Sequence, residues 1–192
     1  MARFVCADPE KMQKTGGRRK THPRWWQVEA QSILRAYRPH QHGVSRMILG
    51  LRQPSNDLVA LGLWEPQRGV GDVRVVLQKA LGVVLSVQGT NVAGELYRYR
   101  LERILHDTSH QKPAPSVLLV QSRIHARNIP SQRLATRFGF AYDHILSDER
   151  AFEATAGADF MQVWTQAWRS TPGTGWKSTT PPAEGVTLIT FP

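Results

Sequence analysis

Apolar and polar positions divide the chain into segments of helical and strand character. A helix is predicted from Pro23 onward, because apolar residues recur there at helical spacing: Trp26, Ala30, Ile33, Leu34 and Tyr37. Two apolar stretches follow, 44–51 and 58–64, separated by the turn residues Pro54-Ser55-Asn56-Asp57. This pattern predicts an antiparallel hairpin.

The middle of the chain predicts a strand followed at once by a helix. Residues 73–87 are apolar and rich in β-branched side chains, and 81–87 is typical of a buried central strand. The helix that begins near Ala93 has one apolar face, formed by Ala93, Leu96, Tyr97, Leu101, Ile104 and Leu105. Four charged residues are predicted on its outer face: Arg98, Arg100, Glu102 and Arg103.

The last third predicts strands at 116–124, 140–146 and 159–168 and a short helix at 129–138 that ends before Gly139. Residues 186–191 could add an edge strand. An early hairpin followed by strand–helix–strand crossovers predicts an α/β (α+β) fold. It would have a mixed, mostly antiparallel central sheet of six to seven strands with helices on both faces. Residues 1–22 are predicted to form a basic, flexible leader, 23–168 the folded domain and 169–192 a Pro/Gly-rich tail.

Composition and charge limit the domain number, the location and the partners that are expected. The chain has 192 residues, one cysteine and a net charge of +10, which suits one domain without disulfide bonds. We read no secretory signal and no span of about 18 apolar residues, so a cytoplasmic location is expected. The first 24 residues carry seven basic and two acidic side chains. Such a leader attracts polyanions such as RNA, although a simply solvated leader fits the same pattern. Seven scattered histidines predict no metal site.

The junction Gln88-Gly89-Thr90-Asn91-Val92-Ala93-Gly94 follows the predicted strand and opens the helix. Unpaired backbone N–H groups and the positive end of the helix dipole meet at such a junction, which suits a phosphate or pyrophosphate. Gly89 and Gly94 remove side chains from the approach, and Asn91 tolerates a left-handed backbone.

Residues Gln88 to Ala93 resemble the acetyl-CoA motif Q/R-x-x-G-x-G/A of the GNAT acetyltransferases, with Asn91 in place of the usual glycine. The segment from Ile124 to Phe140 is similar to the family's second signature, in which a strand ends in V-x-x-x-N and a short helix closes with G-F. Asn128 would cap that helix, with Ser131 three residues later. The resemblance covers Trp25 to Trp168, and the two signatures occur in the family's order.

The resemblance implies a sheet splayed between its fourth and fifth strands and an acetyl-CoA-dependent N-acetyltransferase in which a primary amine attacks the thioester directly. Leu85 and Val87 would pair with the pantetheine arm, and an N–H near Val87 would stabilise the oxyanion. Asn128 and Ser131 would contact the arm from the other strand. The pyrophosphate would lie on the junction, whose cofactor-binding residues are Gln88, Gly89, Asn91, Val92, Ala93 and Gly94.

The acid and the base are less defined by the sequence. The family often has a tyrosine four residues before the closing glycine, and here that residue is Ala135. Ser131 or Tyr142 could protonate the leaving thiolate instead, and Glu65 is the first candidate for the base, with His125 a second. Each of these residues also suits a purely structural role.

Two other functions remain open at this level. The same fold could act without catalysis as a nucleic-acid or protein binding module, or as a toxin-type acetyltransferase that acts on aminoacyl-tRNA. The acceptor class is not readable from the sequence. The protein is expected to be a monomer or a homodimer, without a membrane partner.

Overall fold

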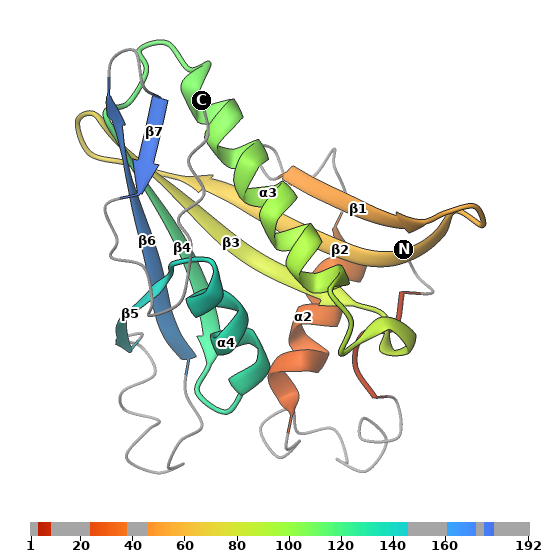
Figure 1. Cartoon of the computed structure of the whole chain (residues 1–192). Coiled ribbons are helices and arrows are strands. Elements are labelled where there is room, and N and C mark those ends of the chain that lie inside the picture. The colour runs from red at the N-terminus through yellow and green to blue at the C-terminus, as the bar shows by residue number, and fades with distance from the viewer. Residues whose placement is uncertain (1–3, 9–23, 38–45, 146–160, 172–174, 179–192) are drawn as a thin grey trace. The chain divides into compact units, whose positions relative to one another are not determined.

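The computed structural model describes residues 4–8, 24–37, 46–145, 161–171 and 175–178. Its helices and strands, labelled in Figure 1 except for the short 3-10 helix η2, are α2 (Trp25–Ala36), β1 (Arg46–Arg52), β2 (Asp57–Gln67), β3 (Val73–Val83), η2 (Leu85–Val87), α3 (Val92–Ser109), β4 (Val117–His125), α4 (Ile129–Arg137), β5 (Ala141–Ile145), β6 (Met161–Thr171) and β7 (Gly175–Ser178). None of the described helices is long and apolar enough to cross a membrane. The predicted order of helices and strands is confirmed, whereas the suggested strand at 186–191 lies outside the described residues.

The strands form one seven-stranded sheet in the order β1-β2-β3-β4-β6-β5, and β7 pairs with β6. The registers of β1 with β2 and of β4, β5 and β7 with β6 are antiparallel. The register of β3 with β4 is parallel and runs from Val73 and Val117 to Gln78 and Ser122. The predicted mixed, mostly antiparallel sheet is therefore confirmed.

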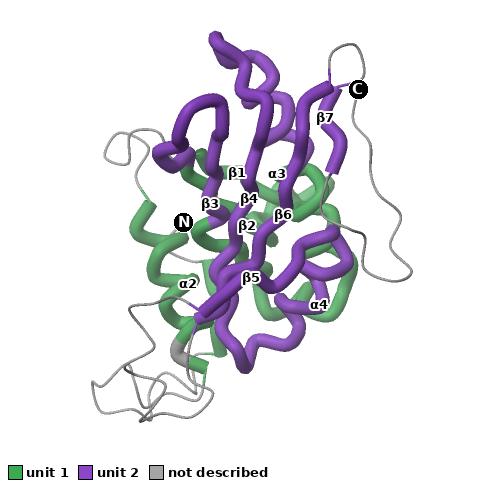
Figure 2. The backbone as a smooth tube through the Cα atoms, turned by 90° about the vertical axis from the view of Figure 1, so that its left-hand side faces the viewer, with its two compact units in different colours: residues 1–65, 79–100 green, residues 66–78, 101–192 purple. Residues whose placement is uncertain are grey.

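The backbone divides into two compact units, coloured in Figure 2. Unit 1 contains residues 1–65 and 79–100, and unit 2 contains residues 66–78 and 101–192. The predicted splay would lie beyond Gln78 and Ser122, where the β3–β4 register ends. Beyond that point the two strands belong to different units, so the splay stays a prediction.

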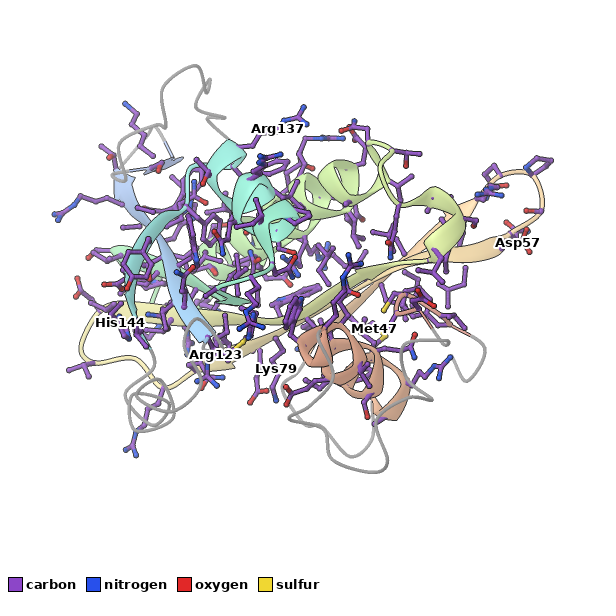
Figure 3. All side chains as sticks on the ribbon, turned by 90° about the horizontal axis from the view of Figure 1, so that it is seen from below. Met47, Asp57, Lys79, Arg123, Arg137 and His144 are labelled. Carbon is purple, nitrogen blue, oxygen red and sulfur yellow. The ribbon has the colours of Figure 1, made fainter. Side chains whose placement is uncertain are left out.

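Unit 1 begins its sheet with the predicted hairpin of β1 and β2. Its turn includes Asn56 with φ +58°, which asparagine tolerates better than most residues. Asp57, at the outer end of the hairpin in Figure 3, pairs in register with Arg52.

Helices lie against both faces of β2 within unit 1. Leu61 and Leu63 are buried in one cluster with Leu34 of α2. Gly62 points the other way, because successive strand residues alternate between faces. A Cβ at Gly62 would meet Arg100 and Leu96 of α3 at 3.5–3.7 Å. Helices therefore cover both faces of β2 in unit 1, and helices on both faces are what the sequence predicts for the sheet.

Residues 4–8 fall within the predicted leader 1–22, yet side chains of this segment lie in the core of unit 1. Phe4, Cys6 and Ala7 are buried. A Cβ at Gly82 would lie 2.8–3.1 Å from side-chain atoms of Leu34, Cys6 and Phe4, so glycine at this position is what admits the N-terminal segment. Residues 9–22, the rest of the predicted leader, lie outside the described residues.

Arg100 corrects a second expectation. It was assigned to the outer face of α3, yet only 1% of it is exposed. Its Nη1 donates to the carbonyl oxygen of Ala80 at 3.4 Å, and its guanidinium lies 4.8 Å from the centroid of the Tyr97 ring. Burial lowers the pKa of Arg100 to about 10, and the nearby Tyr97 offsets part of that effect. The methylene stem packs on Gly62, so a long side chain fills space that glycine leaves open.

The end of β3 corrects a third expectation. The predicted strand to Val87 stops at Val83, and Leu85–Val87 forms η2 instead. Val84 N–H still donates to Val59 on β2, but Leu85 N–H donates to Val5 of the N-terminal segment at 3.2 Å. A contact that is distant in the sequence therefore turns the chain before the helix.

Unit 2 is built on β6, which lies between β4 and β5 (Figure 1). The helix α4 begins at Asn128, whose Oδ1 accepts from Ser131 N–H, and Pro130 lies in the first turn, as predicted. It ends before Gly139, whose φ of +80° favours glycine. Gln166 of β6 donates from Nε2 to the carbonyl oxygen of Phe138, which joins the end of α4 to the sheet.

Candidate functional site

The turn between η2 and α3 forms a concave run of backbone in unit 1. Gln88 N–H donates to Leu85 O, and Thr90 donates to Val87 O from both its N–H and its Oγ1. Gly89 has φ +82°, and no atom lies within 4 Å of the position that a Cβ would occupy there. A left-handed backbone, which Asn91 would tolerate, is therefore found in this turn at Gly89. Asn56 is the only non-glycine residue with positive φ among the described ones.

Several N–H groups of this turn have no acceptor within the described residues. They are those of Gly89, Ala93 and Gly94. Val92 N–H has only a long contact of 3.4 Å to Thr90 Oγ1, and the backbone ladder of α3 begins with Glu95 N–H, which donates to Asn91 O. Donors of this kind at a helix N-terminus, with the dipole behind them, are suited to an anion.

Asn91 shapes the same turn through its side chain. Its Oδ1 lies 2.8 Å from where a Cβ of Gly94 would be, so any larger residue at position 94 would displace it. Its Nδ2 donates to Glu95 Oε1 at 3.0 Å, and Glu95 Oε2 forms an ion pair with Arg98 at 2.7 Å. A carboxylate thus lies in the first turn of α3, where it competes with a bound anion for the positive end of the dipole.

Gln88, the first residue of the motif, is an anchor in this structure. Its Nε2 donates to Cys6 O at 2.9 Å and to Val83 O at 3.1 Å. Cys6 and Ala7 in turn donate from their backbone N–H groups to Gln31 Oε1 on α2, and Arg35 donates to Phe4 O. The N-terminal segment therefore connects α2 with the candidate anion site.

Leu85 and Val87 have both backbone groups engaged within unit 1. Leu85 N–H donates to Val5 O and Val87 N–H to Val84 O, while their carbonyl groups accept from Gln88 and Thr90. Pairing of these residues with a ligand stays a prediction, and it would require those hydrogen bonds to open.

Asn128 and Ser131 lie together in unit 2 and form the cap of α4. His125, just before them, is buried, and its Nδ1 accepts from Arg127 N–H at 3.1 Å. Gln132 donates to the carbonyl oxygens of His125 and Ala126, which holds the end of β4 against α4. These contacts assign His125 a structural position.

The candidate base Glu65 is half-buried at the end of the unit 1 part of β2. It forms an ion pair with Lys79 at 2.5 Å, and Lys79 is labelled in Figure 3. Tyr142, a candidate acid, is 49% exposed on β5 in unit 2 and packs edge-on against Trp164. Among the described residues no three side chains of the metal-ligating types lie close enough to hold a metal ion.

One polar pair was missed by the sequence reading. Gln78 and Ser122 are the last partners in the β3–β4 register, and 4% and 6% of their surfaces are exposed. Ser122 Oγ donates to Gln78 Oε1 at 2.8 Å. Gln78 follows apolar residues and Ser122 follows Gln121, and neither residue by itself indicates a buried polar contact. Because the two residues are 44 positions apart in the sequence, no local pattern predicts that they pair.

Comparison with known proteins tests the motif resemblance. No family model matches the sequence, and no curated protein matches it. Solved structures do: AtaTR bound with acetyl-CoA is 13% identical, with 85% of this chain and 83% of that chain covered, at a TM-score of 0.51. The chain has the GNAT fold. A GNAT family acetyltransferase from Elizabethkingia anophelis with acetyl-CoA bound is 12% identical over 64% of this chain and 75% of that chain, at a TM-score of 0.47.

Residues 88–94, which resemble the acetyl-CoA motif, lie in the turn before α3. The segment that resembles the second signature lies at the junction of β4 with α4. The resemblance read from these two segments is therefore confirmed at the level of the fold.

Proposed function

We propose that this protein is an acetyl-CoA-dependent N-acetyltransferase that transfers the acetyl group to a primary amine. The observation that carries the proposal is the turn before α3, where the N–H groups of Gly89, Ala93 and Gly94 have no acceptor within the described residues. A GNAT fold with this donor set at the position of its acetyl-CoA motif fits a pyrophosphate group.

The turn is suited to a diphosphate in shape as well as in charge. Gly89 leaves open space in front of its backbone, and a larger side chain at position 94 would have to displace Asn91 Oδ1. Gln88 holds the turn from behind through Cys6 and Val83. The donors are thus presented on a backbone that is already ordered, which reduces the entropy cost of binding.

The chemistry is direct transfer between two bound reactants. The amine nitrogen bonds to the acetyl carbon, the bond between carbon and sulfur breaks, its electron pair goes to the sulfur, and the amine proton passes to a base. Holding the two reactants in position supplies most of the acceleration. Glu65 as the base, and Ser131 or Tyr142 as the acid, belong to this proposal together with the contact of Asn128 to the pantetheine arm.

The first experiment is isothermal titration of the full chain with CoA, acetyl-CoA and ADP. We expect a single site with a dissociation constant in the micromolar range. Release of free CoA thiol over a panel of amines then tests catalysis. No heat of binding at high micromolar acetyl-CoA would exclude the proposal, and binding without turnover on any amine would favour the non-catalytic binding module.

A second candidate is a toxin-type acetyltransferase whose acceptor amine is carried by aminoacyl-tRNA. The exposed arginines of unit 2 favour it. Arg127, Arg133 and Arg137 lie at and along α4, and no acidic residue occurs between Ser116 and Tyr142. Figure 3 labels Arg137 at the end of this helix. Such a surface attracts a phosphate backbone independently of its sequence.

Salt dependence separates this acceptor from a small amine. Binding of tRNA should weaken steeply as salt rises, and the substitution Arg133→Gln together with Arg137→Gln should reduce the slope by about 2. Replacement of Arg68 and Arg169, which are also exposed in unit 2 but lie off α4, provides the control. A salt slope of tRNA binding that the α4 substitutions leave unchanged would count against an RNA-linked acceptor.

A further inference from the structure

Two histidines lie close together at the C-terminal end of α3, within unit 2. The sequence predicted no metal site because its histidines are scattered, but His106 and His110 are four residues apart, the spacing that places two side chains on one face of a helix. Their ring centroids are 4.3 Å apart, and the ring planes differ by 31°. Both residues are exposed, and 58% of the His106 side chain is accessible. The two imidazoles therefore form an accessible pair.

The hydrogen bonds of this pair determine which ring nitrogen carries a hydrogen. His110 Nδ1 lies 2.8 Å from the carbonyl oxygen of His106, which can only accept, so Nδ1 is the donor. Ser109 Oγ, 3.2 Å from the same nitrogen, gives its own hydrogen to that carbonyl oxygen at 2.7 Å. His106 Nδ1 lies 3.4 Å from Asp107 Oδ1, and a carboxylate also only accepts.

The second nitrogen of each ring is consequently available to a ligand. In a neutral imidazole with its hydrogen on Nδ1, the Nε2 atom carries a free lone pair. Neither His106 Nε2 nor His110 Nε2 has a partner among the described residues. An exposed pair of such lone pairs is a potential chelating group.

This hydrogen-bonding pattern is typical of histidines that bind metal ions. A metal-bound imidazole usually donates its other N–H to a carboxylate or to a backbone carbonyl group, and the pair has one of each. We infer that His106 and His110 bind one divalent transition-metal ion, of the class of Cu²⁺, Ni²⁺ and Zn²⁺, through their two Nε2 atoms. Imidazole suits these metals, whereas Mg²⁺ and Ca²⁺ prefer oxygen ligands. The inference does not depend on acetyl transfer.

Binding requires only a rotation of exposed side chains. Metal–nitrogen bonds are about 2.0–2.1 Å long, so two neighbouring ligands of one ion lie about 3 Å apart. The rings are stacked at nearly this spacing, and neither is enclosed by other side chains. Because no group of three metal-ligating side chains exists among the described residues, water completes the coordination of the ion.

The surroundings of the pair favour a cation. The negative end of the dipole of α3 lies at this end of the helix. Asp107 adds a carboxylate, although its ion pair with Arg103 at 3.1 Å offsets part of that charge. An ion held by both rings connects the last turn of α3 to the residue that follows it. Metal binding should therefore stabilise this helix end against local opening.

The binding test is isothermal titration of the full chain, without an affinity tag, with the chlorides of Cu²⁺, Ni²⁺, Zn²⁺ and Mg²⁺. We expect binding in the micromolar range that is tightest for Cu²⁺, and no heat with Mg²⁺. His106→Asn and His110→Asn each keep an amide near the position of Nδ1 and remove Nε2. Each substitution should lower the Zn²⁺ affinity by more than about tenfold.

His144 provides the matched control. It is exposed on β5, and its Nδ1 lies 3.4 Å from Asp143 Oδ1, the same distance as between His106 and Asp107. No histidine occurs four residues before or after it. His144→Asn should therefore leave the Zn²⁺ affinity unchanged, because a single imidazole cannot chelate.

Hydrogen exchange measured by mass spectrometry locates the bound ion. With Zn²⁺, the amides of residues 106–112 should exchange more slowly, and a chelator should reverse the effect. The protection should be lost in His106→Asn and in His110→Asn and kept in His144→Asn. If neither Zn²⁺ nor Cu²⁺ binds, or if the two α3 variants match His144→Asn in both affinity and protection, the metal site is excluded.

Discussion

The side-chain amide of Gln88 donates a 2.9 Å hydrogen bond to the carbonyl oxygen of Cys6, 82 residues earlier in the chain. The same amide donates to Val83 O at the end of β3. The first residue of the segment that resembles the acetyl-CoA motif is thus held by the N-terminal segment, which is held in turn by Gln31 of α2. Motif geometry and N-terminal packing are therefore coupled in unit 1.

Replacement of Gln88 tests this coupling. Gln88→Ala removes the donor from the carbonyl oxygen of the buried Cys6, and we expect a loss of about 1–2 kcal/mol in the free energy of unfolding, measured in urea. Affinity for CoA should fall as the turn loses its anchor. Gln53→Ala, which removes an exposed hydrogen bond to Asn56, is the matched control and should change stability by less than about 0.5 kcal/mol. Equal effects of the two substitutions would contradict the anchoring role.

Two glycines allow backbone strain to be separated from ligand binding. Gly89 and Gly71 both have positive φ, +82° and +61°, and at neither would a Cβ meet any atom within 4 Å. Each Gly→Ala substitution should therefore cost about 1 kcal/mol of stability from the left-handed backbone alone. Only Gly89→Ala should also weaken CoA binding, by about tenfold in titration calorimetry. Equal CoA affinity in the two variants would place the pyrophosphate elsewhere.

The carboxylate of Glu95 should oppose an anion bound at the start of α3. It is exposed and lies in the first turn of α3, directly after Gly94, where Arg98 partly neutralises it. Glu95→Gln should tighten CoA binding about twofold to fivefold, with the gain fading as salt is added. Glu102→Gln, further along α3, should leave the affinity unchanged. Weaker binding by Glu95→Gln would show that the carboxylate supports the site.

Cys6 provides a pH test of N-terminal packing. Burial raises the pKa of the Cys6 thiol from 9.0 to about 11, while a backbone hydrogen bond and Arg35 act weakly in the other direction. A thiol that loses its proton more readily when unfolded stabilises the fold below pH 9, and that contribution is lost as pH rises from about 9 to 11.

The stability difference between the wild type and Cys6→Ala should therefore shrink across this window, by on the order of 2 kcal/mol. Urea unfolding at several pH values measures it, and the comparison cancels groups that titrate in both proteins. In the native protein the thiol should react with an aromatic disulfide reagent at pH 8 far more slowly than in denaturant. Rapid native reaction would mean that residues 4–8 leave the core easily.

Periodicity predicted much of the fold because it reports which face of an element is buried. The apolar face of α3 was readable for this reason, and its members Leu96, Leu101 and Ile104 are buried. The same spacing would also place Arg100, four residues after Leu96, on the buried face of α3. The charge of its side chain favoured a prediction of exposure to solvent instead. Only the space left by Gly62, on a strand of another part of the sequence, shows why an arginine is accommodated there.

The features of the candidate site also divide into those that local sequence determined and those that tertiary contacts decided. Local sequence determined the donor set before α3, the Asn128 cap and the glycine after α4, because caps and turns depend on neighbouring residues. Tertiary structure decided that β3 ends at Val83, because Val5 accepts from Leu85 N–H. It also decided that Phe4 and Cys6 enter the core and that Gln78 meets Ser122. Those outcomes depend on contacts between residues far apart in the chain, which no local pattern encodes.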